Sequence, residues 1–573
     1  MKLKKKLTNK AKNQIASLLN EAMRAYLINQ LNVAEQRCQK ILLIQANNPD
    51  ACNLLGKIAE KRGGLEAAKI IYEQSQQCHP NHRGLLASLG LLHSKLESHQ
   101  QAIQQWQRLV KLNPNNADAW QALSSQWYLL RQWDKAEESA RKAIKLGPSR
   151  GELHTNLGRI LRMQRRLDEA CINLNKAIEL APDNIDARYE LAMSTMESGE
   201  MDEAFEMFRN LLKIDPRHTP SLFMMMRFKK MTSHNEVMEQ AATLFNDPSE
   251  PINNRALLAF GLGKAWEDLK EYDKSFTYYA EGNRIRRESI GFDISDEWRN
   301  LKETKNLFNE KIFSRHQIQT SNAEGLFFIV GMPRTGSTLL DKILAVHPNV
   351  VDIGETDDLR EVVGSLTNGD RTNINQQNLL QATDAQLASA AESYLDRIHR
   401  FFGESENYID KTLPNMWLVG FIHLLFPNAK ILHCSRNPLD NCFSIFSTDF
   451  EGSFFRFAYN LQELGEYYRV YRDMMEHWHN VLPSEAYYEV SYESLVASPE
   501  EESRRLIKFC GLDWDDACLN FHESKQAVQT SSLAQVRQPI YKSSIERWKR
   551  YEKHLQPLID ALGDTVQQPQ AKS

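Results

Sequence analysis

The sequence predicts a multidomain chain in which an all-α solenoid of repeated helical pairs precedes an α/β domain with a parallel sheet. Three observations support this division. Prolines recur at a period of 34 residues in the first half, an apolar run meets a glycine-containing turn near residue 330, and short buried runs then alternate with helical patterns. At 573 residues the chain is too long for one core, because domains usually hold ~100–200 residues.

The repeat is defined by three residue types at one period. The prolines are Pro80, Pro114, Pro148, Pro182 and Pro216, the alanines twelve residues earlier are Ala68, Ala102, Ala136, Ala170 and Ala204, and the leucines are Leu89, Leu123, Leu157 and Leu191. A small alanine lets two antiparallel helices approach closely, and the proline closes the second helix. Each pair leaves an apolar face bare, so about five to six units must stack over residues 13–216. The pattern resembles the tetratricopeptide repeat, with Trp120 and Gly158 in that family's aromatic and glycine places.

A helical adaptor is expected after the repeats. Residues 257–287 read as one more helical hairpin, with Ser275 in the place of the repeat alanine. Pro248 and Pro251 mark a loop before it. We therefore expect a repeat solenoid over 1–216, an adaptor over 217–320, an α/β domain over 321–560 and a tail over 561–573.

The second half reads as alternating strands and helices. Buried strands are expected at 326–330, 431–434 and 487–490, and helices at 339–346, 416–426 and 455–478. This alternation is typical of an α/β domain with a parallel sheet.

A phosphate-binding loop is expected directly after the first of these strands. Residues 331–338 read G-x-x-x-x-G-S-T, which is a Walker A frame with Ser337 in place of its lysine. Backbone N–H groups of such a loop and the following helix N-terminus form an anion cradle, and Arg334 is the obvious substitute cation. The plain alternative is a strand–helix turn that uses glycine and proline for geometry alone.

Two segments together resemble a known family. FFIVGMPRTGSTLL followed by VHPNV is similar to the 5′-phosphosulfate loop of sulfotransferases, in the form found in protein-tyrosine sulfotransferases and bacterial tetratricopeptide-repeat sulfotransferases. ILHCSRNPLDNCFSIF places Arg436 and Ser444 eight residues apart, as in that family's 3′-phosphate motif. The resemblance implies that 3′-phosphoadenosine 5′-phosphosulfate is the co-substrate. Its 5′ end would be held by the loop residues Pro333, Arg334, Thr335, Gly336, Ser337 and Thr338.

The same resemblance implies further roles. Glu355 would be the catalytic base, Lys411 would stabilise the leaving oxygen together with Arg334, and Tyr492 would lie against the adenine. The segment that covers the adenosine would contain Ser532, Gln535 and Arg547. This sequence departs from the family pattern in three places: an extra residue lies between Ser532 and Gln535, Arg547 replaces a lysine, and Thr448 replaces an arginine.

Each of these roles has a simpler alternative. Glu355 would serve equally as a carboxylate at a helix start, where Asp357 or Asp358 is the other candidate for the cap. Lys411 would serve as a solvated loop lysine. Cytosolic small-molecule sulfotransferases use a histidine base, but His347, His423 and His433 do not lie in that family's sequence context, and His347 is expected to end the helix after the loop.

The reaction implied is transfer of a sulfuryl group to an acceptor hydroxyl. The expected acceptor is a tyrosine of a peptide or protein presented by the repeat groove, with a glycan or a small phenol left open. No metal is expected, because Arg334 and Lys411 occupy the role that Mg²⁺ has in kinases. The runner-up is a repeat scaffold with a catalytically passive nucleotide-binding domain. An ATP-dependent kinase fits less well, because the Walker lysine is missing.

Composition narrows the remaining classes. Apolar residues make up 42% and charged residues 25%, and the net charge of −4 gives no argument for nucleic acid. The eight cysteines form no C-x-x-C pair, so reduced buried thiols are expected. The basic N-terminus lacks the apolar core of a signal peptide, and no run reaches ~18 uncharged apolar residues. A cytoplasmic location with no membrane span is therefore expected.

Overall fold

The computed structural model describes residues 8–316, 325–369, 374, 376–450, 455–521 and 544–566. The chain forms two compact units, residues 1–196 and 197–573. The division falls inside a helix of the repeat array, before the last proline of the 34-residue series at Pro216. The domain bounds expected from the sequence stay predictions.

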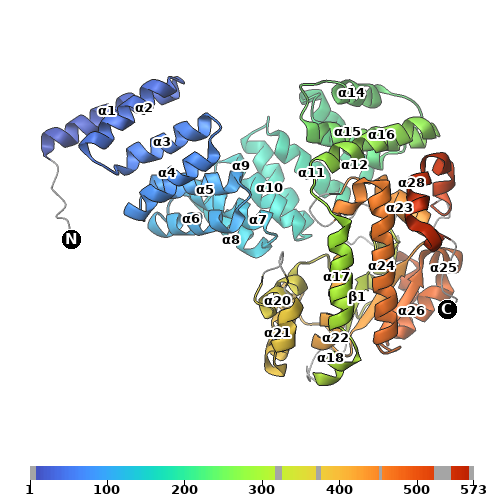
Figure 1. Cartoon of the computed structure of the whole chain (residues 1–573). Coiled ribbons are helices and arrows are strands. Elements are labelled where there is room, and N and C mark those ends of the chain that lie inside the picture. The colour runs from blue at the N-terminus through green and yellow to red at the C-terminus, as the bar shows by residue number, and fades with distance from the viewer. Residues whose placement is uncertain are drawn as a thin grey trace. The chain divides into compact units, whose positions relative to one another are not determined.

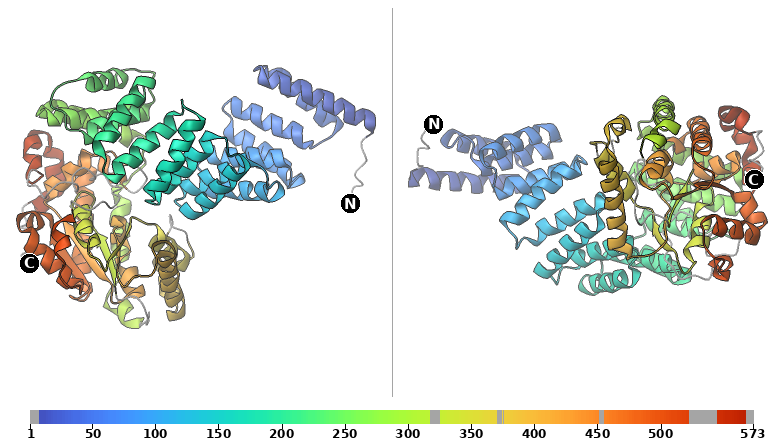
Figure 2. Two further views of the ribbon diagram at one scale, coloured as in Figure 1. Left: turned by 180° about the vertical axis from the view of Figure 1, so that it is seen from behind. Right: turned by 90° about the horizontal axis from the view of Figure 1, so that it is seen from below.

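The first unit is a succession of antiparallel helix pairs, coloured blue to teal in Figure 1 and seen from two further sides in Figure 2. Its helices are α1 (Asn9–Leu27), α2 (Leu31–Ile44), α3 (Pro49–Lys61), α4 (Leu65–Cys78), α5 (Arg83–Lys95), α6 (His99–Leu112), α7 (Ala117–Leu129), α8 (Trp133–Leu146), α9 (Gly151–Met163), α10 (Leu167–Leu180) and α11 (Ile185–Ser198), the last of which crosses the division.

The 34-residue period positions each pair in the same way. Pro80 and Pro114 stand two residues beyond the ends of α4 and α6, where a proline cannot extend the helix. The repeat alanines are fully buried, and Ala102 and Ala136 are 0% exposed. Close packing is enforced by glycines: a Cβ atom on Gly90 would lie 2.5 Å from Trp106. The solenoid expected from the sequence is confirmed.

The second unit begins with helices that extend the helical region. They are α12 (Met201–Ile214), α13 (Thr219–Phe228), α14 (Glu236–Phe245), α15 (Ile252–Asp268), α16 (Tyr272–Glu288), α17 (Ile294–Leu307) and α18 (Glu310–Arg315). The pair α15–α16 has the internal geometry of a repeat: a Cβ atom on Gly263 would lie 2.6 Å from the Tyr279 ring, and Ser275 is 0% exposed. Residues 257–287, read from the sequence as a helical hairpin, form one.

A five-stranded parallel sheet follows, in the order β2-β3-β1-β4-β5. The strands are β1 (Leu326–Val330), β2 (Val351–Gly354), β3 (Tyr408–Asp410), β4 (Lys430–Ser435) and β5 (Tyr487–Ser491). The chain leaves the central strand β1 for one side of the sheet and later returns to the other side, so the order reverses between β1 and β4. This is the place where open α/β sheets bind ligands.

Helices cover both faces of this sheet. They are α19 (Ser337–Ala345), α20 (Asp358–Leu366), α21 (Asp384–Phe402), α22 (Val419–Leu425), α23 (Pro438–Phe446), α24 (Leu461–Val481), α25 (Tyr492–Ala497), α26 (Pro499–Phe509) and α28 (Gln556–Leu562), with a 3₁₀ helix η6 (Arg547–His554) before the last.

The alternation of side chains along β1 separates the two cores. Phe327 and Ile329 pack with residues of α19 and α26, whereas Phe328 and Val330 join the larger core that includes α21, α22 and α24. In Figure 1 the long helices α17 and α24 run side by side beside β1. The α/β class with a parallel sheet, expected from the sequence, is confirmed.

The described residues contain neither a membrane-spanning helix nor a metal-binding cluster. Among them no helix is long and apolar enough to cross a membrane. Within the same ranges no group of three or more His, Cys, Asp or Glu side chains is arranged to hold a metal ion. All eight cysteines have free thiols, five of which are buried, whereas Cys78 is exposed.

Candidate functional site

The residues singled out from the sequence follow directly after the carboxyl ends of the five strands. Loop 331–336 follows β1, Glu355 follows β2, Lys411 follows β3, Arg436 follows β4 and Tyr492 follows β5. Because the strands are parallel, these ends share one edge of the sheet. The topology therefore gathers at one edge residues that lie far apart in the sequence.

The loop after β1 is held in an unusual backbone conformation. Gly331 and Gly336 have φ angles of 141° and 94°, and Arg334 has a φ of 67°. A Cβ atom on Gly331 would lie 2.9 Å from the Cys434 carbonyl oxygen of the neighbouring strand, so this glycine is required by space as well as by conformation. The Asn441 side chain donates to the Pro333 carbonyl at 2.8 Å.

The loop ends at the N-terminus of α19, which begins at Ser337. Gly336 is its N-cap in the left-handed conformation, and Ser337 and Thr338 are buried in the first turn. The first N–H groups of a helix have no partner within the helix, and they carry the positive end of its dipole. The arrangement suits an anion and goes beyond what a plain turn requires, because Arg334 extends from the same loop.

The loop after β1 and the motif after β4 are in direct contact. The Arg334 side chain donates through Nε to Ser444 Oγ at 3.2 Å, and Arg436 Nη1 donates to the Arg334 carbonyl at 2.9 Å. Ser444 lies on α23, which begins at Pro438, close to the start expected from the sequence. The two clusters therefore lie within the span of a single nucleotide.

Buried hydrogen-bonding atoms remain without partners at the end of β4. Arg436 Nε and Ser435 Oγ have no hydrogen-bond partner in the described part of the chain, although Arg436 is 7% and Ser435 is 9% exposed. Unpaired buried donors are costly, and an oxyanion ligand would satisfy them. Ser435 was not singled out from the sequence, where the only available signal is its place between the strand and Arg436.

Tyr492 stands between the two clusters. The Arg436 guanidinium lies 4.7 Å from the centroid of the Tyr492 ring. A Cβ atom on Gly336 would lie 2.4 Å from the same ring, so Gly336 also makes room for the tyrosine. The ring thus borders the phosphate loop and the arginine of the second motif. Its contact with adenine stays a prediction.

Glu355 and Lys411 form an ion pair at the adjacent strand ends. Lys411 Nζ lies 2.8 Å from Glu355 Oε1, with 2% of the lysine side chain and 52% of the glutamate side chain exposed. The alternative of a solvated loop lysine is therefore wrong, because Lys411 is almost completely buried. Glu355 also lies outside the helix start: α20 begins at Asp358 and its N-cap residue is Asp357.

The charge on Lys411 is maintained by a group of carboxylates. Burial disfavours the ammonium, but the Glu355 and Asp341 carboxylates outweigh this and raise its pKa above the ordinary value. Asp341 lies one turn after Ser337 on α19. Lys342 pairs with Asp352 at 3.1 Å in the same group. A permanently charged lysine is consequently fixed behind a half-exposed carboxylate.

The three histidines considered from the sequence have structural contacts. His433 lies between the Tyr471 and Tyr487 hydroxyls, at 2.5 and 2.7 Å, and burial lowers its pKa to about 4. His347 follows the end of α19, as expected, and its ring contacts the Asp513 carbonyl at 2.8 Å. Burial lowers the pKa of His423. The polar contacts of these three rings within the described ranges thus lead away from the ion pair at the ends of β2 and β3.

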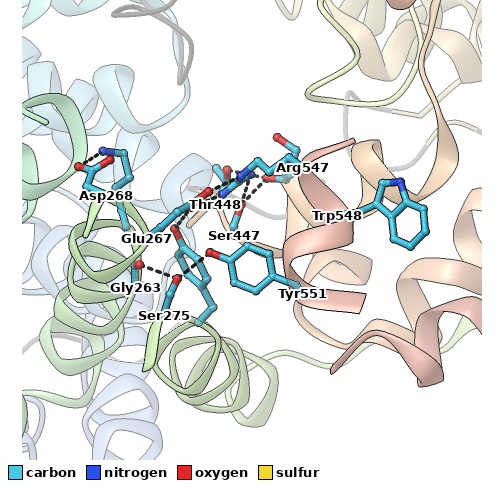
Figure 3. Close-up of polar contacts among 12 residues, drawn as sticks. Gly263, Glu267, Asp268, Ser275, Ser447, Thr448, Arg547, Trp548 and Tyr551 are labelled. Carbon is cyan, nitrogen blue, oxygen red and sulfur yellow. Dashed lines mark hydrogen bonds and ion pairs between the residues drawn. The ribbon is translucent and has the colours of Figure 1, made fainter. Parts of the chain in front are cut away.

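The C-terminal residues of the expected site divide into two groups. Ser532 and Gln535 lie outside the described residues. Arg547 forms an ion pair with Glu267 of α15 at 2.5 Å and donates to Ser447 Oγ at 3.0 Å, as Figure 3 shows. Thr448, which stands where the related pattern has an arginine, donates to the Ser444 carbonyl at 2.9 Å.

The fold and the site define an α/β protein with an anion-binding loop and an arginine–serine pair at the switch point of a parallel sheet. Comparison with known families gives this class a name. Residues 327–516 match the Sulfotransferase family, and residues 128–185 and 185–218 match the Tetratricopeptide repeat. The resemblance seen in the sequence is confirmed: the chain joins tetratricopeptide repeats to a sulfotransferase-family domain.

Individual relatives agree with this assignment. The chain is 34% identical to an uncharacterized protein of Aquifex aeolicus over 380 residues, 65% of this chain and 49% of that protein. It is 27% identical to protein-tyrosine sulfotransferase 1 of Danio rerio over 237 residues, 39% of this chain and 65% of that protein. It is 25% identical to protein-tyrosine sulfotransferase 2 of Gallus gallus, over 42% of this chain and 69% of that protein. The chain thus spans about half of the first relative and about two thirds of the other two.

Proposed function

We propose that this protein transfers a sulfuryl group from 3′-phosphoadenosine 5′-phosphosulfate to the hydroxyl of an acceptor. One observation carries the proposal: the loop after β1 and the motif after β4 meet through the Arg334–Ser444 hydrogen bond at 3.2 Å. A donor with phosphate groups at both its 5′ and 3′ positions needs two anion sites at this separation. The match of residues 327–516 to the Sulfotransferase family supports the same reaction class.

The two ends of the donor would be held by different elements. The 5′-phosphosulfate would lie on the N–H groups of loop 333–338 and on the N-terminus of α19. The 3′-phosphate would take the open Nε donor of Arg436 and the hydroxyl of Ser444, and the unpaired Ser435 hydroxyl lies beside them in sequence. The 3′-phosphate distinguishes this donor from ATP, so groups dedicated to it provide the discrimination.

The chemical step would use the ion pair at the ends of β2 and β3. The Glu355 carboxylate would accept the proton of the acceptor hydroxyl as that oxygen bonds to sulfur. The bond from sulfur to the bridging phosphate oxygen would break, and 3′,5′-bisphosphoadenosine would leave with the negative charge that Lys411 and Arg334 stabilise. Positioning and charge stabilisation are the main contributions that a protein makes to such transfers.

The geometry of the pair suits these roles. Glu355 is half exposed and lies where an acceptor arriving from solvent could reach it, whereas Lys411 is buried behind it. The residues present provide two cations for the charge that develops, which is the task of Mg²⁺ in kinases. A metal-independent reaction therefore stays our prediction.

The acceptor is proposed to be a tyrosine of a peptide or protein. Two relatives are named protein-tyrosine sulfotransferases, and repeat arrays of this class usually bind peptides in a concave groove. A glycan or a small phenol offers the same hydroxyl chemistry and is an outcome of the test. The cytoplasmic location expected from the sequence also stays a prediction.

The proposal is tested by transfer of label. Full-length protein is incubated with ³⁵S-labelled donor and a cell lysate, with and without EDTA, and the labelled products are separated into protein, glycan and small-molecule fractions. Label on tyrosine of protein supports the full proposal, and label in another fraction supports a different acceptor. If the protein binds 3′,5′-bisphosphoadenosine but transfers no label, the domain is a passive nucleotide-binding module and the enzymatic proposal is wrong.

A further inference from the structure

The repeat-like hairpin α15–α16 carries a buried acid that faces the sulfotransferase-family domain. Glu267, at the end of α15, accepts from Arg547 Nε at 2.6 Å and from Arg547 Nη2 at 2.5 Å. The Tyr279 hydroxyl of α16 donates to the same carboxylate at 3.1 Å. Only 11% of the Glu267 side chain and 18% of the Arg547 side chain are exposed. This is a bidentate, largely desolvated pair, the strong form of an Arg–carboxylate interaction.

The arginine of this pair extends to the helix that carries Ser444. Arg547 Nη1 donates to Ser447 Oγ at 3.0 Å, and its guanidinium lies 4.8 Å from the centroid of the Phe443 ring. Phe443, Ser444 and Ser447 all belong to α23 or its C-cap. All three nitrogens of the Arg547 guanidinium are therefore engaged by Glu267 and by α23 (Figure 3).

The residues around Arg547 also hold the beginning of α23 and the other anion-binding residue. The buried Asp440 carboxylate accepts from the Glu546 N–H at 2.6 Å and from the Trp548 N–H at 3.0 Å. Arg436 Nη2 donates to the Ser544 carbonyl at 2.5 Å. Segment 544–548 thus touches both Arg436 and the helix of Ser444, which are the residues proposed to hold the 3′-phosphate.

Further contacts tie the hairpin to the same region. Tyr551 is fully buried, and its hydroxyl lies 3.0 Å from Ser275 Oγ, which itself donates to the Gly263 carbonyl. Asn283 of α16 donates to the Phe446 carbonyl at the end of α23 at 2.8 Å. Figure 3 shows the hairpin on one side and the Arg547–Tyr551 segment on the other, joined through these contacts.

We infer that Glu267 is a positioning residue for the 3′-phosphate site: by fixing Arg547 it sets the place of α23 and of segment 544–548 against Arg436. The inference rests on the proposed function. It assigns to the repeat-like hairpin a part in donor selection, in addition to linking the repeats to the domain. It also implies that Arg547 acts through α23, because its guanidinium is already engaged by protein groups.

The test compares two neighbouring acids on α15. Glu267→Gln removes the charge that holds Arg547, and Asp268→Asn is the matched control. The Asp268 side chain is 12% exposed and pairs with Lys264 at 2.6 Å, away from segment 544–548. Full-length variants are titrated by calorimetry with 3′,5′-bisphosphoadenosine and with 5′-AMP, and folding is checked by thermal unfolding. The ratio of the two affinities isolates the contribution of the 3′-phosphate.

We expect Glu267→Gln to lower this ratio by about 10-fold, the size of losing one hydrogen bond to a charged group, and Asp268→Asn to leave it unchanged. The milder Ser447→Ala keeps the ion pair and should lower the ratio by about 3-fold, which covers the case in which Glu267→Gln does not fold. In a Ser444→Ala background the effect of either variant should shrink, because coupled residues are not additive.

The outcomes separate the inference from the proposed function. If the unmodified protein does not prefer 3′,5′-bisphosphoadenosine to 5′-AMP, the donor assignment itself fails. If it does, and Ser447→Ala together with a folded Glu267→Gln keeps the same ratio or weakens both nucleotides equally, Glu267 has only a structural role and the inference is wrong.

Discussion

Replacement of Glu355 by glutamine separates catalysis from folding and from donor binding. The substitution preserves the size of the side chain but removes the group proposed to accept the acceptor's proton. We expect turnover to fall by at least ~10²-fold, since general-base assistance contributes roughly 10²–10⁴-fold. In activation free energy this corresponds to about 2.7–5.5 kcal/mol.

The structure predicts a small effect of the same change on stability. The Glu355 side chain is 52% exposed, and an ion pair with such an exposed member contributes about 0–1 kcal/mol. Lys411 is 2% exposed, but it would retain the attraction of Asp341 and Asp352 after the pair is lost. The free energy of unfolding should therefore change by about 1 kcal/mol or less.

The assay measures three quantities on the same preparations: transfer of ³⁵S from labelled donor, the Kd for 3′,5′-bisphosphoadenosine, and urea unfolding. Asp357→Asn is the control, because Asp357 is two residues away and its side chain makes no capping hydrogen bond to α20. Glu355→Gln should lose transfer and keep both other quantities. Transfer within ~3-fold of the unmodified protein would place the base elsewhere, because it is far below the expected loss.

Three further predictions follow from the same geometry. Arg334→Ala should abolish measurable binding of the donor nucleotide, and undiminished affinity by calorimetry would count against the loop assignment. Ser444→Ala should narrow the preference for 3′,5′-bisphosphoadenosine over 5′-AMP by about 10-fold, and an unchanged preference would remove Ser444 from the 3′-phosphate site. Burial lowers the pKa of His433 to about 4 and raises that of Asp410 to about 6. As the pH falls from about 6.5 to 4, protonation of the unfolded histidine costs stability, whereas protonation of the folded aspartic acid restores it. Asp410→Asn should therefore lose stability more steeply over this range, and equal slopes of unfolding free energy against pH would contradict these assignments.

The repeats were predictable from the sequence because each 34-residue unit must bury the same contacts. Ala102 and Ala136 occupy positions where only a small side chain fits between two helices, so the period is visible as letters. The strands β1, β4 and β5 were also predictable, because all three form buried or largely apolar runs of at least five residues.

Two strands could not be read in this way. β3 has three residues and β2 has four, which is too short for a periodic signal, and β2 is only half buried over Val351 and Asp352. Both are specified by pairing with a neighbour: Val351 pairs with Tyr408 in β3, which pairs with Leu326 in β1. Such long-range pairing is set by the tertiary structure and leaves little trace in local sequence.

The site shows the same division. The loop after β1 and the Arg436–Ser444 spacing were legible, because backbone geometry and helix phase fix those residues locally. The burial of Lys411, the unpaired Ser435 hydroxyl and the Glu267–Arg547 pair depend on contacts between distant segments. Glu267 and Arg547 are 280 residues apart, so their pairing emerges only once the hairpin α15–α16 has packed against the C-terminal segment.

The central claim is that the loop after β1 and the motif after β4 hold a single nucleotide between them. A crystal structure of the full-length protein with 3′,5′-bisphosphoadenosine tests this most directly. We predict one nucleotide, with its 5′-phosphate at the N-terminus of α19 and its 3′-phosphate between Arg436 and Ser444. A nucleotide bound elsewhere, or one that contacts only one of these two clusters, would contradict the account.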